Sequence, residues 1–113
     1  MAFKPPKGVQ AAAKRALELR RSVSPSRRGG TAVGVARANQ LASGRPVSLD
    51  TVRRMMSFFA RHEVDKKATG FRRGEKGYPT KGKIAWELWG GDSGKSWADR
   101  IWKRESAKKK KRS

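Results

Sequence analysis

The sequence has no cysteine, a single histidine and only nine acidic residues among its 113. The absence of cysteine excludes disulfides and thiolate metal sites, as is typical of proteins from a reducing compartment. Because His62 is the only imidazole, a zinc site would depend on carboxylates, and a nucleophilic serine would have one candidate base. We expect no metal, no cofactor and no enzymatic activity. For His62 we expect a solvated or capping role.

Long hydrophobic runs are also missing. No stretch approaches the roughly 20 apolar residues that a membrane-spanning helix needs. The segment from Met1 to Pro6 lacks the hydrophobic region of a secretory signal. We therefore expect a soluble intracellular protein without a membrane partner.

Basic residues, in contrast, are abundant: 29 Lys and Arg leave a formal net charge of +20. A soluble domain of this size usually has a net charge of about 2 to 8 in magnitude. Because self-repulsion at +20 destabilises a compact state, the excess predicts a polyanionic partner. Nucleic acid is the first candidate, since phosphate contacts with Lys and Arg release condensed counterions. An acidic membrane surface is the weaker candidate, because no lipidation signal or apolar helix face accompanies the basic tail.

The charge is unevenly distributed along the chain. Residues 1–30 have a net charge of +7 and residues 83–113 of +6, whereas residues 31–64, which are rich in apolar side chains, have only +3. This distribution predicts an ordered middle with basic flanks. We expect an all-α protein: a basic arm and linker over residues 1–30, a small helical domain of about four helices over residues 31–104, and a disordered Lys-rich tail over residues 105–113.

The arm contains one predicted helix, from Pro6 to about Arg21. Its apolar positions recur at helical spacing but are mostly alanine, so we expect weak packing. They are Val9, Ala12, Ala13 and Ala16. Residues 22–30 are rich in Ser, Pro and Gly and predict a linker. We expect the whole arm to be mobile, or to become ordered only on its partner.

Two helices are predicted in residues 31–64. Thr31 is a favourable N-cap for a helix that ends at Ser43, before Gly44, and Ser48 is a favourable N-cap for the next helix. This second helix is the clearest amphipathic segment in the chain. Its apolar face carries Val52, Met55, Met56 and Phe59, and its other side carries Arg53, Arg54 and Arg61.

These two helices permit two interpretations. A DNA-binding helix-turn-helix would place the second helix in a DNA groove. The connection between Gly44 and Ser48, however, is longer than the tight turn usual in that motif. We favour an ordinary helical hairpin, whose arginines can still contact phosphates.

We predict a basic, glycine-rich loop over residues 65–80, with Phe71 and Tyr78 as its apolar contacts. A loop of this length is often functional. After it we predict a short helix that begins at Thr80 or Lys81, with a strand over residues 84–89 as the alternative. The next helix, capped by Asp92, should run to residue 104.

The tryptophans divide into two groups. The spacing of Trp89 and Trp97 predicts core positions, whereas Trp86 and Trp102 lie off the main apolar face and are candidates for exposed stacking on bases. The segment at residues 90–96 ends in Gly-Lys-Ser like a P-loop, but Trp89 stands where that motif requires its first glycine. We interpret residues 90–96 as a helix stop followed by a capped helix.

One string of residues is distinctive: IAWELWGGDSGKSWA, at residues 84–98. With residues 30–38 and 47–63, it resembles a module of small uncharacterised phage proteins, chiefly from cyanobacterial viruses, with the pattern IAW-x-LWGGD-x-G-x-x-WA. The resemblance covers roughly residues 29–104 and implies a helical domain of viral origin. It implies no activity for any residue.

Together these features predict a non-enzymatic protein that binds nucleic acid, DNA in preference to RNA, through phosphates and with little sequence readout. The expected location is the host cytoplasm, in association with the nucleoid, or the virion. The side chains that we expect to contact nucleic acid are all basic: Arg53, Arg54, Arg61, Lys66, Lys67, Arg72, Arg73, Lys108, Lys109, Lys110, Lys111 and Arg112.

Two other interpretations remain open. The protein could be a virion or assembly component whose charge meets packaged DNA or an acidic capsid surface; a high copy number in purified particles would indicate this role. It could also be an effector that binds an acidic host protein, in which case the complex should survive nuclease treatment.

Overall fold

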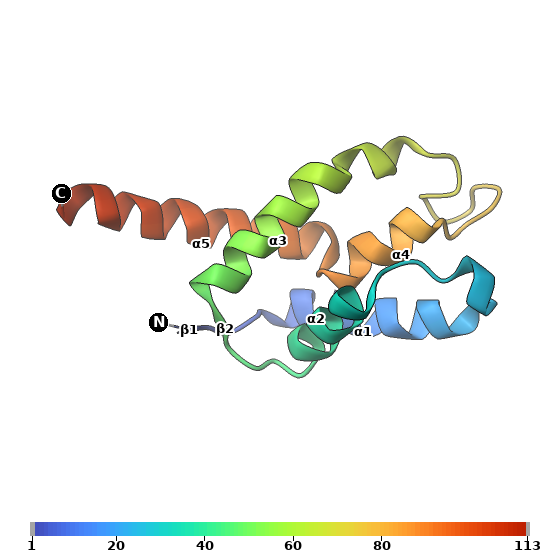
Figure 1. The fold of residues 1–113 in the computed structure, drawn as a ribbon, viewed down its shortest axis with the longest axis horizontal. Helices are drawn as coiled ribbons and strands as arrows, with labels where there is room; N and C mark the ends of the chain where they lie inside the picture. Colours follow the sequence, from blue (N-terminus) through green and yellow to red (C-terminus); the bar gives the residue numbers. More distant parts are fainter. Residues whose placement is uncertain (1, 113) are drawn as a thin grey trace.

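The computed structural model describes residues 2–112 and the side chains of residues 2–108 (Figure 1). Within that part of the chain there are five α-helices, two 3-10 helices and one pair of two-residue strands, which confirms the predicted all-α fold. The elements in chain order are β1 (Ala2–Phe3), α1 (Lys7–Ser22), η1 (Pro25–Arg27), α2 (Ala32–Ala42), β2 (Val47–Ser48), α3 (Leu49–His62), η2 (Glu63–Lys67), α4 (Lys81–Leu88) and α5 (Gly91–Arg112).

Three helices begin at hydroxyl N-caps, of which Thr31 and Ser48 were predicted as caps. The side chains of Thr31, Ser48 and Thr80 each accept a hydrogen bond from the backbone N–H three residues later, at 3.2, 3.2 and 3.0 Å. This bond satisfies a donor that the first turn of a helix cannot use internally. At the end of α2, Gly44 takes a φ of +75°, a conformation that favours glycine.

The short helix α4 lies between α3 and α1 (Figure 1). It packs against α3 on one side and against α1 and α2 on the other, and its C-terminal end meets α5 (Figure 1). Trp86, on this helix, is only 1% exposed, so its predicted exposure is wrong. The reason is that neighbours cover α4 on more than one face, which a single amphipathic pattern does not reveal. The alternative of a strand over residues 84–89 is wrong as well.

The first helix forms part of the core, whereas the sequence predicts a mobile arm. Helix α1 has the predicted position and the predicted buried face: Val9, Ala12, Ala13 and Ala16 are each at most 3% exposed. Its partners are α2, α4 and α5. Small alanine side chains let helix backbones approach closely, so this alanine-rich face, for which we expected weak packing, is well packed.

The predicted linker is held in place by its arginines. Arg28 Nε donates to the backbone carbonyls of Arg20 (2.9 Å) and Val23 (3.2 Å), and Arg20 Nε donates to the carbonyl of Gly29 (3.0 Å). Carbonyls at the end of α1 are thereby satisfied by cationic donors. Beyond these bonds, the Gly29 backbone lies against the backbone of Lys81 so closely that a Cβ at residue 29 would overlap it.

Helices α2 and α3 form neither a helical hairpin nor a helix-turn-helix. Helix α2 packs mainly against α1, and α3 packs mainly against α5. The connection between them includes β2, which pairs antiparallel with β1 so that Ala2 faces Ser48 and Phe3 faces Val47. The start of the chain thus pairs with the connection between the two helices.

Helix α5 continues through Arg112, past residue 105, where we predict a disordered tail. Glu105 is 8% exposed and forms ion pairs with Arg104 (3.3 Å) and Lys108 (3.2 Å). The pair with Lys108, three residues later, stabilises the helix beyond residue 105. In the loop before α4, Phe71 is buried as predicted and Tyr78 is half-buried. No helix in the described part of the chain is long and apolar enough to cross a membrane.

Substitutions on α1 test its place in the core. Ala13→Leu forces a larger side chain into a position with no exposed surface and should lower the free energy of unfolding by about 1–3 kcal/mol. The matched control is Ala11→Leu, at an exposed position of the same helix, which should change it by less than about 0.5 kcal/mol. Urea unfolding of both variants gives the comparison. Equal effects would mean that α1 is not packed as described.

Candidate nucleic-acid interface

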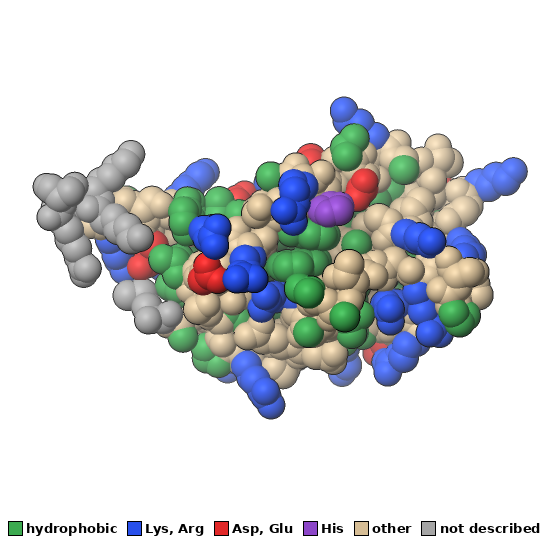
Figure 2. Space-filling model, in the orientation of Figure 1, with side chains coloured by type: hydrophobic (Ala, Val, Ile, Leu, Met, Phe, Trp, Pro, Cys, Tyr) green, Lys and Arg blue, Asp and Glu red, His purple; other side chains and the backbone are tan. Residues whose placement is uncertain are grey.

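A groove with a volume of about 630 Å³ lies where α2, α3 and the start of α4 meet. Figure 2 shows this face, with the purple side chain of the only histidine, blue basic side chains and green apolar ones close together. Five cationic side chains line the groove, which we call the cationic groove: Arg37, Arg53, Arg54, Arg61 and Lys81. Three of these, Arg53, Arg54 and Arg61, are among the predicted contact residues.

Arg53 and Arg54 share one carboxylate. Asp50, one turn earlier on α3, accepts from Arg53 Nη2 and Arg54 Nε at 2.9 Å each. These hydrogen bonds hold the pKa of Asp50 below its usual value. Each guanidinium has five N–H donors. Both arginines are therefore oriented by Asp50 and still have donors for a phosphate.

Arg61 and Lys81 make no ion pair with any residue of the described chain. Both are exposed and line the cationic groove from different helices. Lys81 is the first residue of α4, where the unsatisfied backbone N–H groups add positive potential. An anion bound in the groove could therefore form an ion pair with each of these two side chains without breaking an existing one.

Arg37 is the partly buried member of the group. Its guanidinium lies over the Trp89 ring, 5.3 Å from the centroid, and Nη1 donates to Gln40 at 2.6 Å. Nε is buried without an acceptor, which is unusual in a folded protein. Burial lowers the pKa of Arg37, and the charge of Arg54 lowers it further. Arg37 nevertheless stays protonated at neutral pH, and no carboxylate in the described chain forms an ion pair with it.

Planar groups form a column along the cationic groove. Phe58 stacks on Trp89 with centroids 4.7 Å apart and on His62 with centroids 4.3 Å apart. Phe58 therefore joins the two rings by stacking on both of them. With Arg37 over Trp89, the order of the column is Arg37, Trp89, Phe58, His62. We call it the aromatic column.

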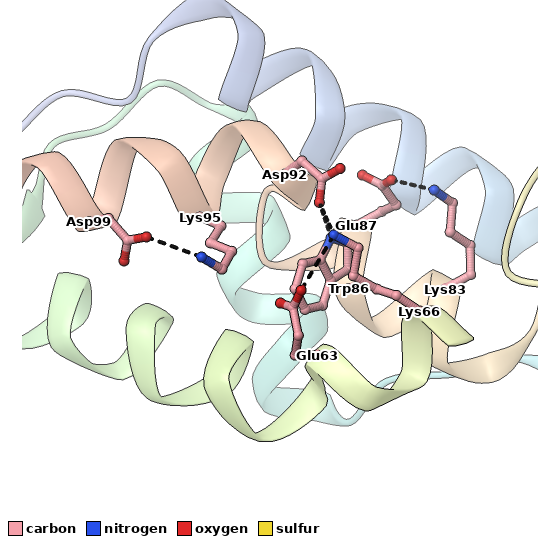
Figure 3. A network of polar contacts seen from close by, with 8 residues as sticks. All are labelled: Glu63, Lys66, Lys83, Trp86, Glu87, Asp92, Lys95 and Asp99. Carbon is pink, nitrogen blue, oxygen red and sulfur yellow. Dashed lines mark hydrogen bonds and ion pairs between the residues drawn. The ribbon is translucent and has the colours of Figure 1, made fainter. Parts of the chain in front are cut away.

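The remaining predicted contact residues lie elsewhere. Lys67, Arg72 and Arg73 are exposed outside the groove. Lys108 pairs with Glu105, and the side chains of residues 109–112 lie outside the described part. Lys66 is occupied within the fold (Figure 3): it pairs with Asp92 (3.1 Å) and Glu63 (3.7 Å) and lies 4.9 Å from the Trp86 ring centroid.

Asp92 also joins this network, and the structure gives it a contact that we did not predict (Figure 3). Its carboxylate accepts from the Trp86 indole N–H at 3.0 Å and from Lys66 at 3.1 Å. Partial desolvation raises its pKa, but the hydrogen bonds from Lys66 and Trp86 and the nearby charges outweigh this, so the pKa lies below its usual value. The buried indole therefore has a charged acceptor.

The segment at residues 90–96 contains the predicted helix stop, but the predicted Asp92 cap is wrong: α5 begins at Gly91, so Asp92 lies within its first turn and its carboxylate accepts from Lys66 and Trp86. The segment follows a helix instead of the buried strand of a P-loop. Gly90 and Gly91 take φ values of +107° and +62°, and a Cβ at Gly94 would lie 2.8 Å from the Trp89 carbonyl oxygen. Within the described residues there is no cluster of three or more metal-ligating side chains.

Sequence reasoning missed Arg37, Lys81 and the aromatic column. Arg37 and Lys81 are 44 positions apart, on helices whose packing no local pattern encodes. The spacing of Phe58 and His62, four residues apart on a helix, was a usable signal for their contact. Nothing in the sequence indicated that Trp89 would stack on Phe58.

The Asp92 network should make stability depend on pH in the acid range. A carboxyl whose folded pKa is depressed stabilises the fold above its unfolded pKa of about 3.9, and this contribution is lost as the pH falls through the folded value. The difference in unfolding free energy between wild type and Asp92→Asn should thus be largest near pH 7 and shrink below about pH 4. Because the Asp92 side chain is 75% exposed, this difference in unfolding free energy should stay under about 1 kcal/mol at every pH.

Urea unfolding at pH 7 and pH 3 measures this difference. Asp99→Asn, which removes a carboxylate from a single Lys95 pair on the same helix, is the control for the loss of a surface acid. An Asp92→Asn difference that is constant across the two pH values would contradict the role of the ionised carboxylate.

No family model, curated protein or solved structure matches this chain. The resemblance to phage proteins therefore stays a prediction from the residues that carry it.

Proposed function

We propose that this protein binds nucleic acid without an enzymatic step, through phosphate contacts and with little sequence readout. The observation that supports the proposal is the cationic groove, in which Arg37, Arg53, Arg54, Arg61 and Lys81 line one hollow. Like charges gathered on one concave surface raise the local potential and attract an anion.

The chemistry of the groove suits phosphodiesters. Four of its five cations are arginines, whose planar forks bind phosphate oxygens in pairs. The only carboxylate in the lining, Asp65, is held by His62 Nδ1 at 2.9 Å. Phosphate contacts alone carry no sequence information, so we expect little sequence readout.

Basic residues outside the groove extend the same interaction. The chain as a whole carries +20, and exposed cations such as Lys67, Arg72 and Arg73 lie outside the groove. Contacts of this kind supply essentially all of non-specific affinity for nucleic acid. The groove would define where the strand lies, and the surrounding charge would increase affinity.

Salt dependence tests the proposal. With about 6–10 phosphate contacts, affinity for a DNA duplex should fall by roughly 10³ to 10⁵ between 50 and 200 mM salt. Arg61→Gln should weaken binding to all sequences alike and reduce the salt slope by about 1. Arg100→Gln removes the same charge from an exposed site outside the groove and should have a smaller effect.

Fluorescence anisotropy with labelled oligonucleotides measures both quantities. A flat salt response of the wild type would overturn the proposal. Equal effects of the two substitutions would show that total charge matters and that the groove does not.

The C-terminal charges give a second test. Deletion of residues 109–113 removes Lys109, Lys110, Lys111 and Arg112 and leaves the Glu105–Lys108 pair in place. The salt slope should fall while the urea midpoint stays within error of the wild type, because every core residue of the described side chains (residues 2–108) is retained. An unchanged slope would exclude the tail from the interface.

A further inference from the structure

We propose that an unpaired base of a single strand stacks on the outer face of His62 and extends the aromatic column by one member. This inference rests on the proposed function and adds the class of nucleic acid that the cationic groove takes: single-stranded, with at least one base turned into the groove. It also gives a binding role to His62.

The His62 ring presents a suitable surface. One face stacks on Phe58 at 4.3 Å with an interplanar angle of 26°, and among residues 2–108 no second aromatic ring stacks on the imidazole. The side chain is 39% exposed, and it lines the cationic groove. Aromatic side chains that are held in this way are the usual platforms for unpaired bases.

The ring is also held in one orientation. Nδ1 is hydrogen-bonded to Asp65 at 2.9 Å, and Phe58, on which the ring stacks, itself stacks on Trp89. A side chain that is already ordered loses little conformational entropy when a ligand binds. His62 is therefore preorganised for stacking, whereas a freely rotating surface histidine would not be.

Phosphate-binding groups accompany this surface. Arg61 precedes His62 in sequence, and Lys81 lines the same groove from the first turn of α4; neither makes an ion pair within the described chain. A nucleotide with its base on His62 thus has cations in the same groove for its phosphates. The combination of a planar face and unpaired cations fits a nucleotide better than it fits a simple anion.

A duplex cannot use this arrangement. Its bases are already stacked on both sides within the helix, so no base face is free to stack on the ring of His62. A single strand has free base faces and a flexible backbone that can enter a concave groove. We therefore expect the groove to discriminate between the two by the base, while both still bind the surrounding charge.

The test compares His62→Ala with His62→Phe in the full-length protein. The alanine variant removes the planar face, and the phenylalanine variant keeps a planar face but loses the polar nitrogens. The half-exposed position makes both compatible with folding, which urea unfolding checks. Binding is measured at 200 mM salt with oligo(dT), with a hairpin duplex of equal charge, and with an abasic strand of the same length.

We expect wild type to bind oligo(dT) more tightly than the duplex and about tenfold more tightly than the abasic strand. His62→Ala should lose about tenfold on oligo(dT) and little on the duplex or the abasic strand, and His62→Phe should bind oligo(dT) like wild type. Arg100→Gln, the control for charge, should weaken all three ligands alike.

The outcomes separate the two proposals. Binding of oligo(dT) that His62→Ala leaves unchanged, or weakens equally on all three ligands, would overturn the stacking on His62 and leave the phosphate-binding function standing. Loss of oligo(dT) binding in both variants would show that the imidazole nitrogens, and not the ring face, matter, which also overturns the inference. A wild type that binds none of the ligands even at 50 mM salt, where phosphate contacts are strongest, would overturn the proposed function itself.

Discussion

The enclosure of Trp86 is the constraint on which the rest of the structure depends. The indole is packed edge-on against Phe59 and Phe71, with centroids 4.8 and 6.4 Å away, and its N–H donates to Asp92. A side chain of this size contributes several kcal/mol only if its whole surface is removed from water. Because α4 has only eight residues, it cannot cover itself, so α1, α3 and α5 pack around it.

The basic residues divide into two classes by what they contact. Arg20, Arg28 and Lys66 satisfy carbonyls, a carboxylate and an aromatic face inside the fold. Arg61 and Lys81 do none of this among the described residues and face a common groove. A formal charge of +20 therefore overstates the charge that is available to a partner, and its distribution in sequence is a poor guide to its distribution in space.

The sequence predicted the elements well and their arrangement poorly. Hydroxyl caps, glycine stops and helical periodicity are local, so the bounds of α2, α3 and α4 followed from them. The place of α1 in the core did not follow from such local signals. Its alanine-rich face predicts little burial from the sequence, whereas in the structure the small side chains let neighbouring helices pack closely. Arg53, Arg54 and Arg61 were predicted from one helix face. Their meeting with Arg37 and Lys81 depends on tertiary packing that no local pattern contains.

The close approach of Gly29 to Lys81 has a consequence for how distant relatives of this chain would be identified. Any side chain at residue 29 would overlap the Lys81 backbone, so the segment before α2 can pass the first turn of α4 only as glycine. A relative with another residue there must have α4 displaced and a groove of different shape. In an alignment, glycine at position 29 together with basic residues at positions 37 and 81 would therefore mark the members that share this groove, even where overall similarity has been lost.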